Sequence, residues 1–267
     1  MKKNIYLCII KNSYMSHQYL RRQIFSLTTA LLLVGSLFCC SSQAQDIRFP
    51  GLWTGVFFQN HIGSWDWNTS LSNLANLEDR NFEGIDYPVS AVRFQFVNLI
   101  SYHHNQHWYF STGLHYQRNY PFDDRYNNEF RPFEQIEFRH KISKMAVTHM
   151  LRLNQRFIEV KADKEYSLNH SFQYKTSLNI PLRIISEHKK LYLSAYSEEY
   201  FGISGPFIDD SFCEFWLYAA VGFQWRYSSR LEIGIGHEYL VRNSLLDTRI
   251  SWYPAINYIA QFNWHRA

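Results

Sequence analysis

The fold is decided by a stretch in which polar and apolar side chains alternate, residues 169–180, NHSFQYKTSLNI. Successive side chains of a β-strand point to opposite faces, so this alternation is typical of a strand with one polar and one apolar face. The polar face carries six consecutive polar residues: Asn169, Ser171, Gln173, Lys175, Ser177 and Asn179. Such a strand suits a transmembrane β-barrel, because its polar face lines a wet lumen and its apolar face meets lipid.

The same period of two recurs along most of the chain. It marks ten segments, at residues 52–60, 90–102, 107–118, 132–142, 145–159, 167–182, 189–200, 213–226, 230–241 and 255–265. Two weaker stretches, 64–74 and 246–252, would raise the number of strands to twelve. An even number is typical of bacterial outer-membrane barrels. We therefore predict an all-β fold, a closed antiparallel up-and-down transmembrane β-barrel of about ten strands, with twelve as the alternative.

The gaps between the segments alternate in length. The shorter gaps are 103–106, 143–144, 183–188 and 227–229, and the longer ones are 61–89, 119–131, 160–166, 201–212 and 242–254. Short periplasmic turns alternating with long outer loops are expected of such a barrel when both of its ends lie in the periplasm. In hydrocarbon every backbone amide and carbonyl needs a partner within the protein, so the first and last segments should pair and close the sheet.

The first 44 residues differ from the rest. They hold five basic residues and no acidic one, followed by an uncharged, mostly apolar run at 24–40 and by the small-x-small triplet Ser42-Gln43-Ala44. This pattern predicts an export signal at 1–44 and a single mature domain at 45–267. Three alternatives stay open: an N-terminal membrane anchor, a lipoprotein signal at Cys39 or Cys40, and a start at Met15.

The composition of the mature part limits its partners. Without the five basic residues of the leader, the 27 Lys and Arg fall to 22 against 23 Asp and Glu, so no nucleic-acid partner is implied. Cys213 remains as a lone thiol and cannot form an internal disulfide. Aromatic residues make up 18% of the chain, as the aromatic girdles of an outer-membrane barrel require. Mean hydropathy is nonetheless below zero, and no long apolar run follows the leader, which excludes a helical membrane protein.

Several short motifs also resemble a known family. They are an aromatic-Gly opening at 51–55 (GLWTG), the charged stretches 133–139 (FEQIEFR) and 152–159 (RLNQRFIE), and FQYK at 172–175. Together they resemble an uncharacterised family of bacterial outer-membrane β-barrels that is known only as a domain of unknown function. The resemblance covers nearly the whole mature chain. It implies a barrel in the cell outer membrane, with membrane lipid as a partner, and it implies no activity.

Charged side chains on adjacent predicted strands form the candidate site. The residues expected to line the lumen are Glu137, Arg139, Arg152, Asn154, Arg156, Gln173 and Lys175. Inward-facing charges on neighbouring strands can form cross-strand pairs. One interpretation is a constriction or binding site for small anionic solutes, because guanidinium groups bind carboxylates and phosphates in bidentate fashion. The other, which the narrow lumen of such a barrel favours, is a structural network that fills the barrel and keeps it shut.

Two further motifs are interpreted as having no chemical role. His103-His104-Asn105-Gln106-His107 is a polar turn rather than a metal site, because adjacent histidines in a strand point apart and no Cys or carboxylate lies nearby in sequence. Outer-membrane lipid hydrolases place a His and a Ser two positions apart on one strand, whereas His170 and Ser171 are adjacent and split across two faces. We therefore predict a protein that is not an enzyme and has no cofactor. The runner-up to the barrel is a soluble periplasmic or secreted β-sandwich that binds a ligand.

Overall fold

The computed structural model describes residues 46–82, 85–124, 126–159, 165–205, 212–241 and 248–263. The predicted export signal lies outside these residues, as do Trp264 and His265 at the end of the last predicted segment. The strands are β1 (Asp46–Ile62), β2 (Trp65–Asn76), β3 (Arg80–Phe82), β4 (Ile85–Tyr87), β5 (Ala91–His103), β6 (Trp108–Asn119), β7 (Asn127–Ile142), β8 (Met145–Glu159), β9 (Tyr166–Ser186), β10 (Lys189–Ser204), β11 (Phe212–Arg226), β12 (Ser229–Val241) and β13 (Thr248–Asn263). In this described part, no helix is long and apolar enough to cross a membrane.

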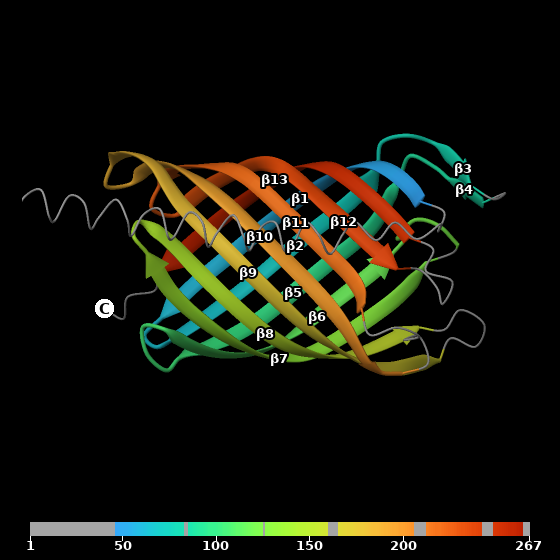
Figure 1. The fold of residues 1–267 in the computed structure, drawn as a ribbon, viewed down its shortest axis with the longest axis horizontal. Coiled ribbons are helices and arrows are strands. Elements are labelled where there is room, and N and C mark those ends of the chain that lie inside the picture. Colours follow the sequence, from blue (N-terminus) through green and yellow to red (C-terminus); the bar gives the residue numbers. More distant parts are fainter. Residues whose placement is uncertain are drawn as a thin grey trace, which may run out of the picture. The chain divides into compact units, whose positions relative to one another are not determined.

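Eleven strands of the described chain close into one barrel, in the order β1-β13-β12-β11-β10-β9-β8-β7-β6-β5-β2. The strands run obliquely around the barrel, and the small β3–β4 hairpin projects at one end (Figure 1). Neighbours along the chain pair antiparallel throughout. The predicted all-β closed barrel is therefore confirmed, and a single closed sheet excludes the two-sheet sandwich.

The number of strands differs from the prediction. All ten predicted segments form barrel strands, and the weaker stretch 64–74 is a complete eleventh strand, β2. The other weak stretch, 246–252, extends into β13 and adds no strand of its own. The predicted even number was wrong because only one of the two stretches is separate.

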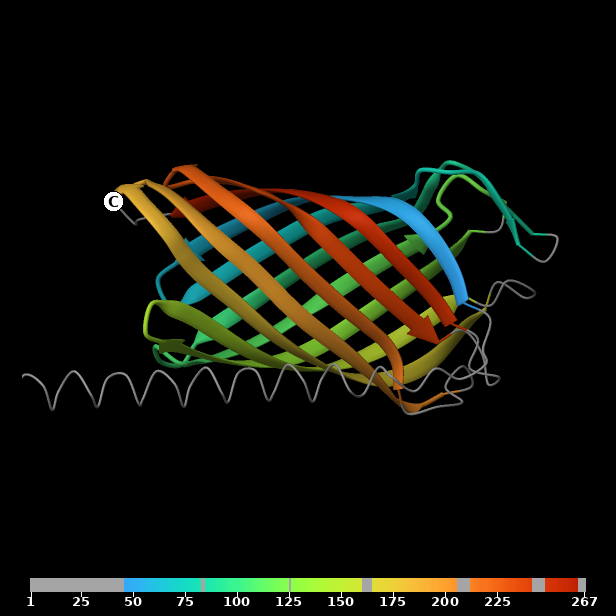
Figure 2. The ribbon, with the colours of Figure 1, turned by 45° about the horizontal axis from the view of Figure 1, so that its top comes forward.

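An odd number of strands changes how the barrel closes. Successive hairpins reverse the chain direction, so the first and last of eleven strands run the same way. β1 and β13 do pair, as predicted, but they pair in parallel, with Gly55 opposite Asn257 and Phe57 opposite Ile259. The fully antiparallel closure was therefore wrong. β1 begins and β13 ends at opposite ends of the barrel (Figure 2), not at one end as predicted.

The connections sort by length between the two ends of the barrel. Five turns of two to four residues, 63–64, 104–107, 143–144, 187–188 and 227–228, gather at what we call the short-turn end. The other five connections, of six residues or more, gather at the long-loop end. The predicted gap 61–89 contains a tight turn, β2 and a loop that carries β3 and β4. Gly63 has a φ of 62° in that tight turn, a left-handed conformation that favours glycine.

The inward-facing side chains of the barrel are mostly polar or aromatic, and the outward-facing ones are mostly apolar. On β9 the inward-facing Asn169, Ser171 and Gln173 are almost fully buried, while Leu168 on the opposite face is 43% exposed. Aliphatic side chains form an exposed band around the outer face: Leu71, Ile100, Leu114, Ile136, Leu151, Leu153, Leu217, Val221, Ile233, Ile235 and Ile256. This is the reverse of a water-soluble domain, which places its apolar side chains inside.

Aromatic side chains border the aliphatic band on the outer face. Near the short-turn end these exposed residues are Trp65, Trp67, Tyr102, Trp108 and Tyr227, and near the long-loop end they are Phe130, Tyr166, Phe201 and Trp252. Trp65 and Tyr102 pack with ring centroids 5.1 Å apart, as do Trp108 and Phe138 at 4.9 Å. Two aromatic borders with aliphatic residues between them are the pattern of interfacial girdles.

Candidate functional site

Buried ion pairs fill the half of the lumen nearest the long-loop end. We call this set the ionic layer, and it comprises Arg93, Glu129, Arg131, Arg156 and Glu238. The Arg93 Nη2 lies 2.8 Å from the Glu238 carboxylate, and the guanidinium stacks on Trp216 at 5.2 Å from the ring centroid. Charges that leave water need close partners, since an unpaired buried charge costs several kcal/mol.

Glu129 holds the other side of the ionic layer together. Its Oε1 accepts hydrogen bonds from Nε of Arg131 at 2.6 Å and from Nε of Arg156 at 2.5 Å. The same two arginines reach Oε2 through their Nη2 atoms. Two bidentate contacts on one carboxylate fix the position of both guanidinium groups.

Aromatic rings pack beside the ionic layer. Trp53 lies 5.6 Å from Trp216 and 6.0 Å from Tyr253, measured between ring centroids. Leu74 and Tyr200 complete this buried cluster. A Cβ on Gly236 would lie 2.1 Å from the Tyr253 ring, so glycine at this position leaves the space that the ring occupies. The long-loop half of the lumen is thus tightly packed.

A cavity of about 460 Å³ lies in the lumen. It is on the short-turn side of the ionic layer and of the aromatic cluster. Its lining includes the aromatic residues Trp53, Phe57, Tyr196 and Tyr218. It also includes the polar and charged residues Glu137, Arg139, Arg152, Gln173, Lys175 and Glu198. The side chains of Arg139 and Lys175 are 37% and 27% exposed, so solvent reaches this part of the lumen.

All seven residues predicted to line the lumen lie on the inward faces of β7, β8 and β9. Five of them line the cavity: Glu137, Arg139, Arg152, Gln173 and Lys175. The other two lie elsewhere, because Arg156 belongs to the ionic layer and Asn154 is buried beside Gln173. The predicted set is therefore divided between two levels of the barrel.

Arg139 and Lys175 are paired in different ways, one within its own strand and the other across neighbouring strands. Glu137 accepts hydrogen bonds from Arg139, two residues along its own strand, at 2.6 and 2.9 Å. Lys175 lies 2.8 Å from Glu198 on the neighbouring strand β10, and Glu198 also accepts hydrogen bonds from Gln173 and Tyr200. Both cations are thus neutralised by a carboxylate.

Arg152 is different, because no carboxylate of the described residues lies within 4.0 Å of its guanidinium. Its Nε and Nη2 donate to Oε1 of Gln135 at 2.9 and 2.6 Å, and the guanidinium stacks on Phe133 at 3.9 Å. Also in the cavity lining, Glu232 accepts hydroxyl hydrogen bonds from Tyr192 and Tyr218 at 3.0 and 2.9 Å. The Glu232 carboxylate is therefore hydrogen-bonded by phenols, whereas Arg152 is a cavity cation that makes no direct contact with a carboxylate of the described residues.

Sequence reasoning missed Glu129, Arg131 and Glu198. All three were open to prediction as inward residues, because each lies an even number of positions from other polar residues on its strand. Whether a residue is at an odd or an even position in its strand predicts which face its side chain is on, but not which side chain it contacts in the lumen.

A family model described as "Protein of unknown function (DUF2490)" matches residues 50–247, well over half of the chain. The chain belongs to this family. No curated protein and no solved structure matches it. Because the description of the DUF2490 family carries no activity, a function for this member has to be argued from its own lumen.

The two remaining motifs of this DUF2490 member lie as follows. Ser171 faces inward and is fully buried, whereas His170 faces outward and its Nδ1 lies 3.1 Å from Oγ of Ser204 on β10. Among the described residues no carboxylate hydrogen-bonds His170. His103 ends β5, faces inward and lies beside Asp66, a carboxylate that is distant in sequence.

Proposed function

We propose that this DUF2490 protein is an outer-membrane β-barrel that binds a small anionic solute in its lumen. The observation that carries the proposal is Arg152, a cation on the wall of the cavity without a carboxylate partner among the described residues. A partly desolvated charge is costly unless an opposite charge compensates it. A carboxylate or phosphate in the cavity would supply that charge and accept the hydrogens that Gln135 leaves free.

The outer face supports the membrane location. Its aliphatic band would be unfavourable in water, since large contiguous apolar patches are rare on soluble monomers. The aromatic residues at both borders match the interfaces of a bilayer. The sheet is also closed, so each barrel strand has a neighbour on both sides for its backbone groups, as hydrocarbon requires.

The packing of the lumen supports binding over free passage. The ionic layer and the Trp53–Trp216–Tyr253 cluster fill the long-loop half with buried side chains. The cavity lies on the other side of these layers, where side chains are partly exposed. A solute entering from the short-turn end would therefore reach Arg152 and stop at the ionic layer.

Titration of the purified protein in detergent micelles with inorganic phosphate and with a small dicarboxylate tests the proposal. We expect saturable calorimetric binding of at least one of the two, weakened about tenfold or more by Arg152→Gln, because a charged hydrogen-bond pair contributes about 1.5–3 kcal/mol. The matched control is Arg183→Gln, at an exposed position near the short-turn end. Equal affinity in the native protein and the Arg152→Gln variant, or no binding of either anion, would overturn the proposal.

A further inference from the structure

A cluster of two histidines and one aspartate lies at the short-turn end of the lumen, one inward-facing layer beyond the cavity. His61 comes from β1, Asp66 from β2 and His103 from β5, three strands that are neighbours in the barrel. His61 and Asp66 are direct partners across the tight 63–64 turn. The backbone amide of His103 donates to the carbonyl of Ser64 at 2.8 Å, which fixes the end of β5 against the same turn.

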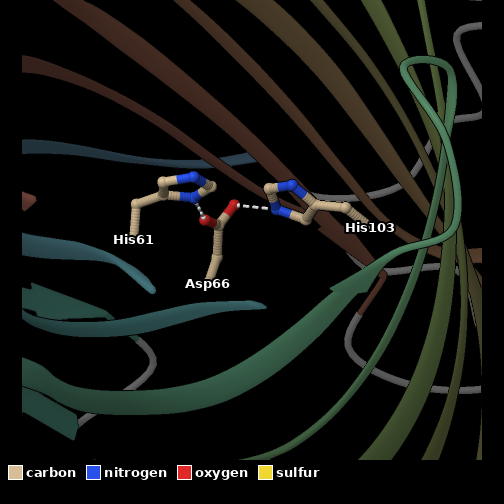
Figure 3. Close-up of side chains that lie close together, drawn as sticks. All are labelled: His61, Asp66 and His103. Carbon is tan, nitrogen blue, oxygen red and sulfur yellow. Dashed lines mark hydrogen bonds and ion pairs between the residues drawn. The ribbon is translucent and has the colours of Figure 1, made fainter. Parts of the chain in front are cut away.

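The carboxylate of Asp66 lies between the two imidazole rings (Figure 3). Its Oδ1 is 2.8 Å from Nδ1 of His61, and its Oδ2 is 2.7 Å from Nε2 of His103. The rings lie with centroids 5.3 Å apart and an interplanar angle of 28°. The three donor atoms are all within 4.8 Å of one another.

One of these three ligand atoms, Nε2 of His103, has no hydrogen-bond partner among the described residues. His61 and Asp66 form an ordinary hydrogen bond. Nε2 of His103 is buried and close to Oδ2, but within the described residues it makes no contact with hydrogen-bond geometry. An imidazole nitrogen and a carboxylate oxygen that lie 2.7 Å apart without hydrogen-bond geometry can both bind one cation placed beside them.

We propose that His61, Asp66 and His103 form a binding site for a divalent transition-metal ion of the zinc class. Neutral imidazole and carboxylate are the ligands that Zn²⁺ and its first-row neighbours accept. Three protein ligands leave coordination positions for water, and the side-chain exposure of 45%, 18% and 21% for His61, Asp66 and His103 allows water to reach them. The Tyr109 ring packs against the His103 ring with centroids 4.4 Å apart, and the Arg139 guanidinium lies 3.7 Å over the same Tyr109 ring.

The site was invisible from sequence for a definite reason. The five-residue stretch that ends at His107 contains no acidic residue, and the histidine that matters is the one inside the strand. Its partners lie on another hairpin, and only the register of β2 against β5 brings Asp66 beside it, with Trp65 opposite Tyr102.

Metal titration of the untagged protein tests the proposal, after extraction into detergent and removal of bound metal with a chelator. We expect Co²⁺ to bind with one equivalent per barrel, to give the visible absorption of a low-symmetry site, and to be displaced by Zn²⁺. Asp66→Asn and His103→Ala should each weaken binding more than tenfold, since loss of even an outer-shell partner costs ten- to a hundredfold. The matched control is His104→Ala, which removes a histidine next to His103 and should leave the affinity unchanged.

Three readouts keep the test independent of the folding of the variants. Heat-modifiable migration on a gel shows whether each variant forms the barrel. X-ray absorption of the native zinc-loaded protein should show two imidazole nitrogens among light-atom ligands, and Zn²⁺ should raise its unfolding midpoint because it binds only the folded state. An unchanged midpoint, the absence of imidazole scattering, or full affinity in folded Asp66→Asn would overturn the proposal and leave a hydrogen-bonded triad. Loss of the binding in His104→Ala as well would assign the metal to surface histidines instead.

Discussion

At the scale of single residues, the lumen depends on carboxylates that serve several donors at once. Glu129 holds Arg131 and Arg156, and Glu198 accepts hydrogen bonds from Gln173 and Tyr200 while it neutralises Lys175. Removal of such a carboxylate leaves a cation and several donors without an acceptor, which costs more than a single lost contact.

The variant Glu198→Gln tests this dependence. We expect it to lower the free energy of unfolding by about 2 kcal/mol, because the Lys175 ammonium loses its counter-charge in a partly buried site. Urea unfolding in detergent or lipid vesicles measures the change. The double variant Glu198→Gln/Lys175→Met should recover part of the loss, because the unpaired charge is removed as well. A destabilisation that the second substitution deepens would contradict this account.

The sequence predicts the face of each of these residues but not its partners. Alternation alone places Gln173 and Lys175 inward, and both line the cavity. It does not show that Lys175 meets Glu198, because that contact depends on how β9 is registered against β10, which has three register shifts along its length. The same limit hides the contact between His103 and Asp66, whose strands adjoin through a loop that carries an additional hairpin.

At the scale of elements, the alternation of polar and apolar residues predicted a strand clearly where one face was entirely polar and the other entirely apolar. β2 was only a weak segment because its outward face mixes Trp67 and Leu71 with Thr69 and Asn73. Polar residues interrupt the apolar face of this strand, so the alternation with a period of two is less evident in its sequence. In the barrel, β1 and β5 hold β2 in place through eleven or more backbone pairs on each side. This one strand beyond the ten confident segments makes the number of barrel strands odd, so the first and last strands pair in parallel.

The outer face of β12 offers a test at this scale. Ile235 is 49% exposed in the middle of the aliphatic band. A lysine there should lower the folding free energy in phospholipid bilayers by about 2–4 kcal/mol, because the charge would lie in hydrocarbon. The matched control is Ser194→Lys, which adds the same charge to the lumen cavity. Equal and small effects of the two substitutions in vesicles would show that the outer face does not contact lipid.

At the scale of the whole molecule, an eleven-stranded barrel with a parallel seam has its first and last strands entering from the same end. The long-loop end therefore receives the start of both β1 and β13, and the short-turn end receives their finish. The metal site lies at the short-turn end, the cavity with Arg152 above it, and the ionic layer beyond the cavity. The partly exposed cations of the cavity, Arg139 and Lys175, therefore lie on the short-turn side of the ionic layer.

The central claim is that the inward faces meet water and protein while the outward faces meet lipid. Spin labels placed singly at residues 172–178 of β9, in vesicles and on a Cys213→Ser background, test it most directly. We predict that collision with oxygen, which partitions into lipid, peaks at positions 172, 174, 176 and 178 and falls at 173, 175 and 177, where a polar relaxation agent has better access than at their neighbours. A profile in which the polar agent reaches the even positions most readily would contradict a membrane-spanning barrel.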